Sequence, residues 1–170
     1  MIYFVPKHFK PREGSHIPVL IKILSIADGP VLELGTGFNS TPVLHWLCNE
    51  NKRELVSYES SPEYFEVAKR YISDFHQVNL VEDENWDTID IESRHWSVVF
   101  IDHAPGPRRV VELERVAQHA DYVIVHDTER RSSWHRRYRK GFPKYKERWD
   151  YTTAYPYTSV LSNFKDLSNL

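Results

Sequence analysis

The sequence predicts an α/β fold: a doubly wound, mainly parallel sheet of seven strands with an antiparallel last strand and helices on both faces. Short apolar runs rich in β-branched residues recur along the chain, and such runs are typical of strands buried on both faces. Segments with helical spacing separate these runs, which is the alternation expected of right-handed βαβ units. A glycine turn directly after the first apolar run is also typical of such sheets.

The first part of the chain contains five expected strands, at 31–34, 54–59, 76–83, 97–102 and 121–127. The segment at 76–83 is the most polar of the five. Two further strands are expected in KERWDYTTAY and TSVLSNFKDL, with a turn near Pro156 between them. We expect the last strand, near residues 158–164, to insert antiparallel into the sheet.

Helices are expected at about 15–27, 40–48, 60–75 and 106–120, followed by an exposed basic helix that Gly141 ends. Ser60, Pro62 and Glu63 supply the third helix with a cap, a first-turn proline and an acid three residues after the cap. Apolar residues then recur at three- and four-residue spacing up to Phe75, which predicts one buried helical face.

Size and composition favour one globular domain. The chain has 170 residues, of which 41% are hydrophobic and 27% charged, as is ordinary for a soluble protein. We predict a single domain over 1–170, with 1–28 as an N-terminal helix or lid and 129–170 as a basic helix and a β-hairpin. Cys48 is the only cysteine, which excludes an internal disulfide and a thiolate metal cluster. No apolar run suits a membrane span or a signal peptide, so we expect no membrane association and a cytoplasmic protein.

The stretch PVLELGTGFNSTPVL, residues 30–44, carries the first chemical signal. Doubly wound folds bind ligands where the first strand turns into the first helix, and glycines let a ligand approach the backbone there. The stretch lacks the third glycine of the dinucleotide fingerprint, which argues against a nucleotide-dependent oxidoreductase. Glu33, two positions before Gly35, would repel a pyrophosphate and attract a cationic ligand.

The sequence E-L-G-T-G, followed by Ser-Thr at a helix start, resembles motif I of the class I S-adenosylmethionine-dependent methyltransferases, a family with a Rossmann-like fold. The resemblance covers about residues 29–129. It implies that this motif surrounds the methionine end of S-adenosylmethionine, which carries an ammonium group and lies beside the sulfonium. The cofactor-binding residues expected here are Glu33, Gly35, Gly37, Ser40 and Thr41.

Two further positions in register with the motif are expected to contact the cofactor. Glu59 ends the second strand, where an acid accepts hydrogen bonds from ribose hydroxyls in related sheets. The acidic loop VEDE follows the third strand, and the resemblance implies that Asp83 accepts a hydrogen bond from the adenine amine. Trp86 either packs on adenine or covers the sheet edge, and the sequence favours neither alternative.

The fourth and fifth strands end in Ile-Asp-His and His-Asp-Thr, and adjacent strand ends would bring Asp102 and Asp127 together. The pairing resembles methyltransferases that act on small molecules, including catechol-type O-methyltransferases, in which two aspartates and an amide residue hold magnesium. Thr128 stands where the amide residue would be. A magnesium ion, if bound, would lie on Asp102 and Asp127, but we expect activity without metal.

Asp102, His103 and Asp127 are therefore the expected catalytic residues. Neighbouring residues of a strand face opposite sides, so one of His103 and His126 should face the site. We choose His103 as the group that takes a proton from the acceptor. His8 and His16 would reach the site only if the N-terminal segment folds over it.

Residues 130–148 contain nine basic residues and one acid, Glu147, with aromatic residues between them. The segment is expected to be a solvated helix; the alternative is a binding site for RNA or a phosphorylated ligand. The net charge of −2 argues against a nucleic-acid partner. We expect methyl transfer from S-adenosylmethionine to an oxygen or nitrogen of a small molecule. The alternative is a cofactor-binding module without turnover that engages an anionic partner. The sequence predicts no particular oligomeric state.

Overall fold

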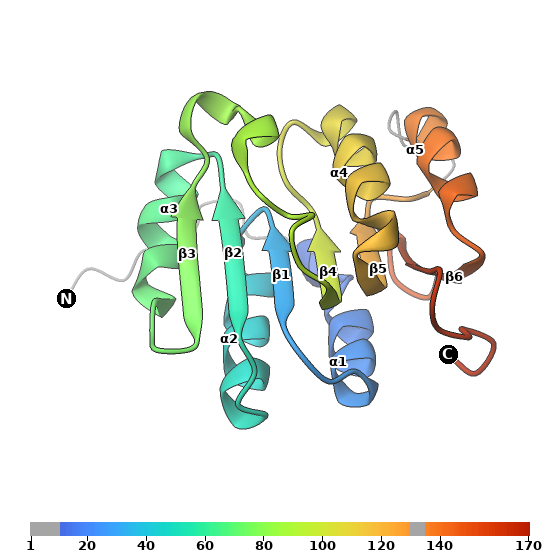
Figure 1. Ribbon diagram of the computed structural model, residues 1–170, viewed down its shortest axis with the longest axis horizontal. Coiled ribbons are helices and arrows are strands. Elements are labelled where there is room, and N and C mark those ends of the chain that lie inside the picture. Colours follow the sequence, from blue (N-terminus) through green and yellow to red (C-terminus); the bar gives the residue numbers. More distant parts are fainter. Residues whose placement is uncertain (1–10, 130–134) are drawn as a thin grey trace.

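The computed structural model describes residues 11–129 and 135–170. A seven-stranded sheet in the order β3-β2-β1-β4-β5-β7-β6 forms its centre (Figure 1). The strands are β1 (Val31–Leu34), β2 (Leu55–Glu59), β3 (His76–Leu80), β4 (Trp96–Ile101), β5 (Ala120–His126), β6 (Glu147–Tyr151) and β7 (Thr158–Ser162). Strands β1 to β5 pair in parallel, and β7 lies antiparallel between β5 and β6. The predicted fold class is confirmed.

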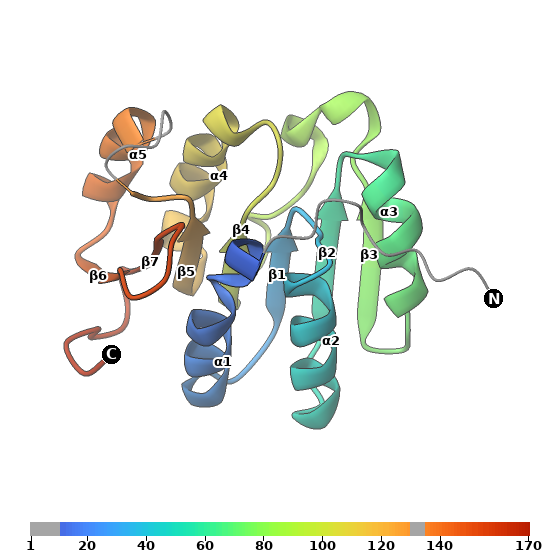
Figure 2. The ribbon, with the colours of Figure 1, turned by 180° about the vertical axis from the view of Figure 1, so that it is seen from behind.

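The helices are α1 (Ile17–Ile26), α2 (Ser40–Glu50), α3 (Pro62–Ala68), α4 (Arg109–Arg115) and α5 (His135–Gly141). Helices α1, α2 and α3 lie on one face of the sheet, and α4 and α5 lie on the other (Figures 1 and 2). None of the helices described is long and apolar enough to cross a membrane. Helix α3 is shorter than predicted, because the chain tightens into a 3-10 turn over Lys69–Tyr71 and leaves the helix before Phe75.

Each face of the sheet has its own hydrophobic core. Neighbouring residues of β4 alternate between the cores, because successive side chains of a strand point to opposite faces. Phe100 packs with residues of α1 and α2, including Leu20 and Leu44. Ile101 packs on the other side with Trp86 and Leu113. Both faces of β4 are buried, which explains why its sequence is apolar except for Ser97.

The strand order reverses beside β1, whose neighbours are β2 and β4. In open α/β sheets such a switch point leaves a crevice outside the carboxyl ends of the strands. The chain leaves β1 at Gly35, whose amide donates to the carbonyl of Tyr58 in β2. The Asp102 amide, which follows β4, donates to the carbonyl of Leu34. These bonds hold the ends of β1, β2 and β4 in register at the crevice.

Candidate functional site

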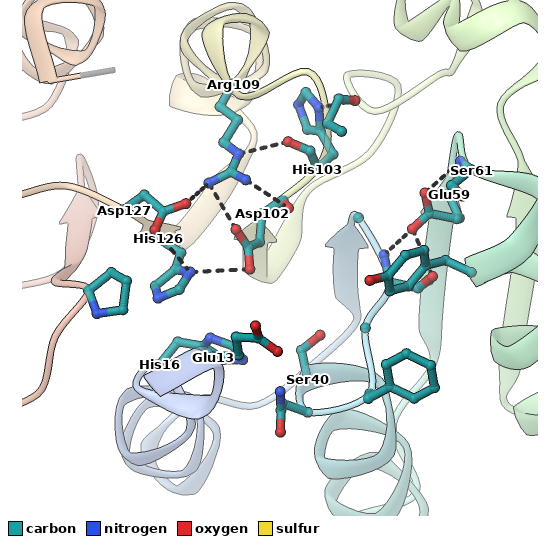
Figure 3. Close-up of a pocket in the computed structure, with 18 of the residues that line it drawn as sticks. Glu13, His16, Ser40, Glu59, Ser61, Asp102, His103, Arg109, His126 and Asp127 are labelled. Atoms are coloured by element: carbon teal, nitrogen blue, oxygen red, sulfur yellow. Dashed lines mark hydrogen bonds and ion pairs between the residues drawn. The ribbon is translucent and has the colours of Figure 1, made fainter. Parts of the chain in front are cut away.

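A pocket of about 560 Å³ opens at this edge of the sheet (Figure 3), within the usual size range of small-molecule sites. Its lining has two sides. The glycine-loop side consists of residues 35–40 with Glu59, Ser61 and Tyr64. The charged side consists of Asp102, Arg109, His126 and Asp127, with His16 beside them. Residues of the predicted cofactor and acceptor sites therefore meet around one space.

Gly35 and Gly37 serve different needs in the loop after β1. Gly35 has φ +93°, and a Cβ atom there would lie 2.7 Å from the carbonyl carbon of Asp102 and closer still to the His103 backbone. Glycine at this position thus lets β1 and β4 approach each other. At Gly37 a Cβ atom would meet only the Ser40 hydroxyl, at 3.5 Å, so the fold itself tolerates a side chain there.

Glu59 joins the glycine loop to the start of α3. One of its carboxylate oxygens accepts hydrogen bonds from the Thr36 amide, at 2.7 Å, and from the Thr36 hydroxyl, at 2.8 Å. The other accepts from the Ser61 amide, at 2.7 Å. Glu59 also lines the pocket, and carboxylate oxygens can accept more than these bonds. The geometry is compatible with the predicted contact to ribose hydroxyls.

Glu33 lies beneath the loop rather than in the pocket, so the expected direct contact with a ligand is corrected. Its side chain is fully buried and accepts hydrogen bonds from Ser40 at 2.7 Å, Ser57 at 2.6 Å and Thr41 at 3.0 Å. The Thr41 hydroxyl in turn accepts from the Gly37 amide at 2.9 Å. Glu33 and Thr41 thus hold the loop from behind, and Ser40 lines the pocket.

The burial of Glu33 predicts a pH-dependent stability. Burial, opposed by the three hydroxyl donors, raises the pKa of Glu33 to about 7. The folded state therefore binds more protons than the unfolded state between about pH 4.5 and 7, and this group's contribution to stability falls as pH rises through that window. Through Glu33, the free energy of unfolding of the wild type should fall by up to about 3 kcal/mol across this window, and the Glu33→Gln variant should lack this fall.

Urea unfolding of the wild type and the Glu33→Gln variant at pH 5 and pH 7.5 measures the effect. The exposed Glu63→Gln variant is the control, because its side chain meets water in both states. If wild type and Glu33→Gln show the same change in unfolding free energy between the two pH values, Glu33 does not titrate as described.

On the charged side, Arg109 stands between Asp102 and Asp127. One guanidinium nitrogen of Arg109, Nη1, lies 2.8 Å from Asp102 and 2.9 Å from Asp127. The remaining nitrogens donate to the backbone carbonyls of His103 and Asp102. Burial opposes ionisation of Asp102, but the charges of Arg109 and His126 outweigh it and hold the pKa of Asp102 well below its usual range. The sequence analysis did not identify Arg109 as a partner of the two carboxylates.

This arrangement does not fit a magnesium ion shared by the two carboxylates. The space between them holds the Arg109 guanidinium, whose charge would repel a cation at that point. Thr128 is 4% exposed, and its hydroxyl is hydrogen-bonded to the Ser159 hydroxyl at 2.9 Å. The chemistry of the residues present therefore disfavours the magnesium site that the resemblance allowed.

Both His103 and His126 line the pocket, but the His103 side chain is fully buried and turned away from it, so the geometry favours His126 over His103 as the histidine that faces the site. His103 is 1% exposed, its ring nitrogens lie 3.0 Å from Glu112 and 3.1 Å from the Ala104 carbonyl, and its ring stacks on Trp86. Because neighbouring side chains alternate, the turn of Asp102 into the pocket sends His103 towards α4. His126 Nδ1 lies 3.2 Å from Asp102 Oδ2 (Figure 3).

Asp83, which was expected to contact adenine, and Trp86, for which that contact was one of two alternatives, both lie away from the pocket. Asp83 is exposed, has φ 52° and does not line the pocket. Trp86 is fully buried, stacks on His103 and donates to the Ala104 carbonyl at 3.0 Å. Trp86 therefore belongs to the core. His8 lies outside the described residues, as does the first part of the basic segment, 130–134.

The sequence matches no protein-family model and no curated protein. Several solved structures have a fold similar to that of this chain. The N-terminal domain of human METTL16 in complex with SAH is 13% identical, with a TM-score of 0.63 over 97% of this chain and 73% of that one. The O-methyltransferase from Bacillus cereus in complex with SAH is 15% identical, with a TM-score of 0.62 over 93% and 83%. Streptococcus pneumoniae Sp1610, a putative tRNA (m1A22) methyltransferase, is 15% identical, with a TM-score of 0.58 over 95% and 74%.

Proposed function

We propose that this chain transfers the methyl group of S-adenosylmethionine to an oxygen or nitrogen of a small molecule. The proposal starts from the fold of the chain, which is that of the class I S-adenosylmethionine-dependent methyltransferases. The observation that carries the proposal is the two-sided pocket, in which the glycine-loop side faces the charged side across one space (Figure 3). Two structures with this fold hold SAH, the form of the cofactor that remains after methyl transfer.

The cofactor would lie against the glycine-loop side. Gly37 leaves the backbone open to a close approach, and Glu59 offers carboxylate lone pairs to ribose hydroxyl donors. Asp102 and Asp127 carry two negative charges against the one positive charge of Arg109. Because the transferring sulfonium is a cation, these carboxylates favour its approach to the charged side, whereas the charges of Arg109 and of a protonated His126 oppose it.

The acceptor would lie between the sulfonium and the charged side. Asp102 and Asp127 line the pocket and can orient a hydroxyl or amine by accepting hydrogen bonds from it, so that its lone pair points at the methyl carbon. The new bond forms as the carbon–sulfur bond breaks, the sulfur keeps the electron pair, and the acceptor releases a proton. Most of the rate enhancement would come from holding the two reactants in line.

The proposal is tested by identifying an acceptor. Small molecules that copurify with the protein are identified by mass spectrometry and then incubated with the protein and S-adenosylmethionine carrying a labelled methyl group. We expect label in one small molecule and formation of SAH. Tight cofactor binding with no transfer to any acceptor would instead favour the binding module without turnover.

Substitution of Glu59 tests the cofactor side. We expect Glu59→Ala to weaken S-adenosylmethionine binding by about 1–3 kcal/mol, because hydrogen bonds to a charged group are lost. Isothermal titration calorimetry measures the affinity. Glu63→Ala, four residues further on and exposed, is the matched control. Unchanged affinity in a folded Glu59→Ala protein would rule out this cofactor pose.

An RNA substrate is the second candidate. Arg137, Arg139 and Lys140 are exposed on α5, and one structure with this fold is a putative tRNA methyltransferase. The net charge of −2 argues against strong binding to a polyanion, and we expect none. Fluorescence anisotropy with labelled RNA at about 50 and 200 mM salt measures it. Micromolar, salt-sensitive binding that disappears when these three residues are replaced by Gln would overturn this expectation.

A further inference from the structure

His16 is a buried histidine with no hydrogen-bond partner among the residues that the structure describes. Its side chain precedes α1 and is 3% exposed, and neither ring nitrogen bonds to any of the described residues. Its ring lies edge-on to His126, with the centroids 4.8 Å apart. Buried polar groups are normally paired, and one that is not calls for an explanation such as a bound ion.

The hydrogen bonds around His126 fix which of its nitrogens is free. The Ser15 hydroxyl donates its one hydrogen to the Pro156 carbonyl at 2.7 Å. Ser15 Oγ must therefore accept from His126 Nε2, which lies 3.0 Å away and carries a hydrogen. This leaves Nδ1 facing Asp102 Oδ2 at 3.2 Å. A neutral ring would place a lone pair against a carboxylate, so a cation, either a proton or a metal ion, belongs between them.

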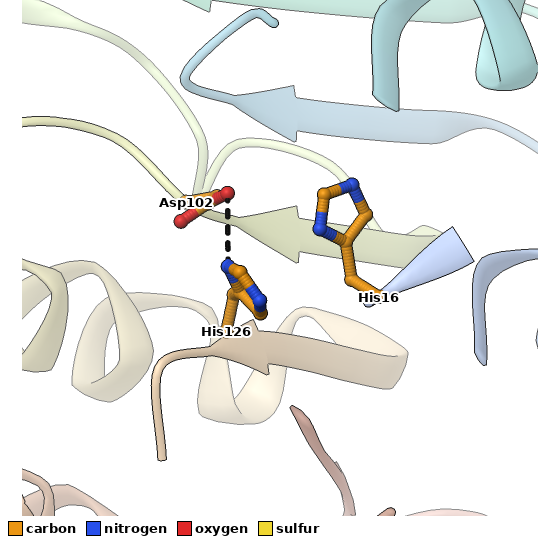
Figure 4. Close-up of side chains that lie close together, drawn as sticks. All are labelled: His16, Asp102 and His126. Carbon is orange, nitrogen blue, oxygen red and sulfur yellow. Dashed lines mark ion pairs between the residues drawn. The ribbon is translucent and has the colours of Figure 1, made fainter. Parts of the chain in front are cut away.

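The three side chains converge on one point (Figure 4). One ligand atom from each of His16, Asp102 and His126 can be chosen so that all lie within 4.8 Å of one another. Two ligands on a tetrahedral ion are separated by about 3.3 Å, given bond lengths of about 2.0–2.1 Å. The 3.2 Å between His126 Nδ1 and Asp102 Oδ2 already has this spacing, and a ring nitrogen of His16 lies within 4.8 Å of both, so the His16 ring would have to move closer to bind the same ion.

We infer that His16, Asp102 and His126 bind one divalent transition-metal ion. Two imidazoles and one carboxylate suit zinc, iron, cobalt or nickel, whereas magnesium prefers oxygen ligands. The bond from His126 to Ser15 is the kind of outer contact that orients metal-bound histidines. Arg109 pairs with the other oxygen of Asp102, Oδ1, and so leaves Oδ2 directed at the site.

The site differs from the Asp102–Asp127 pair, where Arg109 stands. All three ligand residues line the pocket, so the remaining positions on the ion would face the acceptor. The existence of the site does not rest on the proposed function, but its use to hold an acceptor oxygen or nitrogen does.

Zinc binding tests the inference. The purified protein is stripped with EDTA, dialysed and titrated with ZnCl₂ by calorimetry, and with CoCl₂ by visible absorption. We expect one ion per chain, cobalt bands of a site with nitrogen and oxygen ligands, and at least a tenfold weaker affinity in His16→Ala and in His126→Ala. His95→Ala is the matched control. His95 is exposed, and Asp121 is the one described residue with which it forms an ion pair, so these two side chains do not make up a three-ligand site. This control should bind zinc as the wild type does.

Three outcomes would overturn the metal site: no zinc binding, equal affinity in His16→Ala and wild type, or loss of binding in His95→Ala. If no zinc binds, the cation between His126 and Asp102 is a proton on His126. His16→Gln, which keeps a polar side chain, together with a thermal melt of each variant, separates lost ligation from lost folding. S-adenosylmethionine is titrated into the stripped protein in parallel. Cofactor binding without zinc binding overturns the metal site alone, and zinc binding without cofactor binding overturns the proposed function alone.

Discussion

Arg109→Met is expected to destabilise the folded state by up to about 3–5 kcal/mol, the usual cost of removing one partner from a buried ion pair, because Arg109 is buried although its two carboxylate partners are only half-buried. The variant would leave Asp102 and Asp127 facing each other without a cation between them. It would also remove the donors to the carbonyls of His103 and Asp102. An exposed salt bridge contributes only about 0–1 kcal/mol, so burial decides the size of the effect.

Urea unfolding measures this loss against Arg94→Met. Arg94 makes an equally well-formed pair with Glu54, but both side chains are 41% exposed. We expect the control to lose less than about 1 kcal/mol. Adding Asp127→Asn to Arg109→Met should restore part of the stability, because it removes one of the two opposed charges. A loss no larger than that of Arg94→Met would show that the charged side does not depend on Arg109.

Gly35→Ala is expected to cost about 3–5 kcal/mol as well, at the upper end for a single substitution. A left-handed backbone conformation costs a residue with a side chain about 1–3 kcal/mol. The new Cβ atom would also overlap the backbone of Asp102 and His103, which cannot rotate away as a side chain could. The ends of β1 and β4 would have to separate.

Gly37→Ala is the matched control, two residues away in the same loop. Its Cβ atom has ordinary room, so thermal unfolding should change little, while cofactor binding should weaken because Gly37 lines the pocket. Comparing the two melting temperatures distinguishes Gly35, which the close packing of β1 and β4 requires, from Gly37, which leaves room for a ligand. A Gly35→Ala protein that melts like Gly37→Ala would contradict the close approach of β1 and β4.

The fold was predictable because its signals are local. Runs such as VLEL and SVVFID are mostly apolar, and the structure buries both faces of these strands. The meeting of Asp102 and Asp127 followed from parallel strands, whose carboxyl ends share one edge. The end of α3 was not predictable in this way, because the spacing of apolar residues continues to Phe75 while the chain does not stay helical.

The sequence did not identify the site residues whose position depends on the rotation of a helix or on contacts with distant parts of the chain. Arg108 and Arg109 are adjacent, and only the rotation of α4 decides that Arg109 turns to the carboxylates while Arg108 pairs with Asp87 and Glu112. Ser15 lies 111 residues before His126, to which it bonds. No local pattern marks either contact. Alternation along a strand predicted that one histidine faces the pocket, but it could not choose between His103 and His126.

The two sides of the pocket come from different parts of the sheet. The glycine loop and Glu59 follow β1 and β2, whereas the charged side follows β4 and β5. Under the proposed function, changes of acceptor preference can therefore accumulate on the half of the sheet edge that carries the charged side while the half that carries the glycine loop keeps the cofactor. Tyr155 and Pro156 line the charged side from the connection between β6 and β7, which makes them suitable positions for a randomised library. Gly35 lies where β1 and β4 approach each other, between the two halves of the sheet edge, so selection for new acceptors should leave it unchanged.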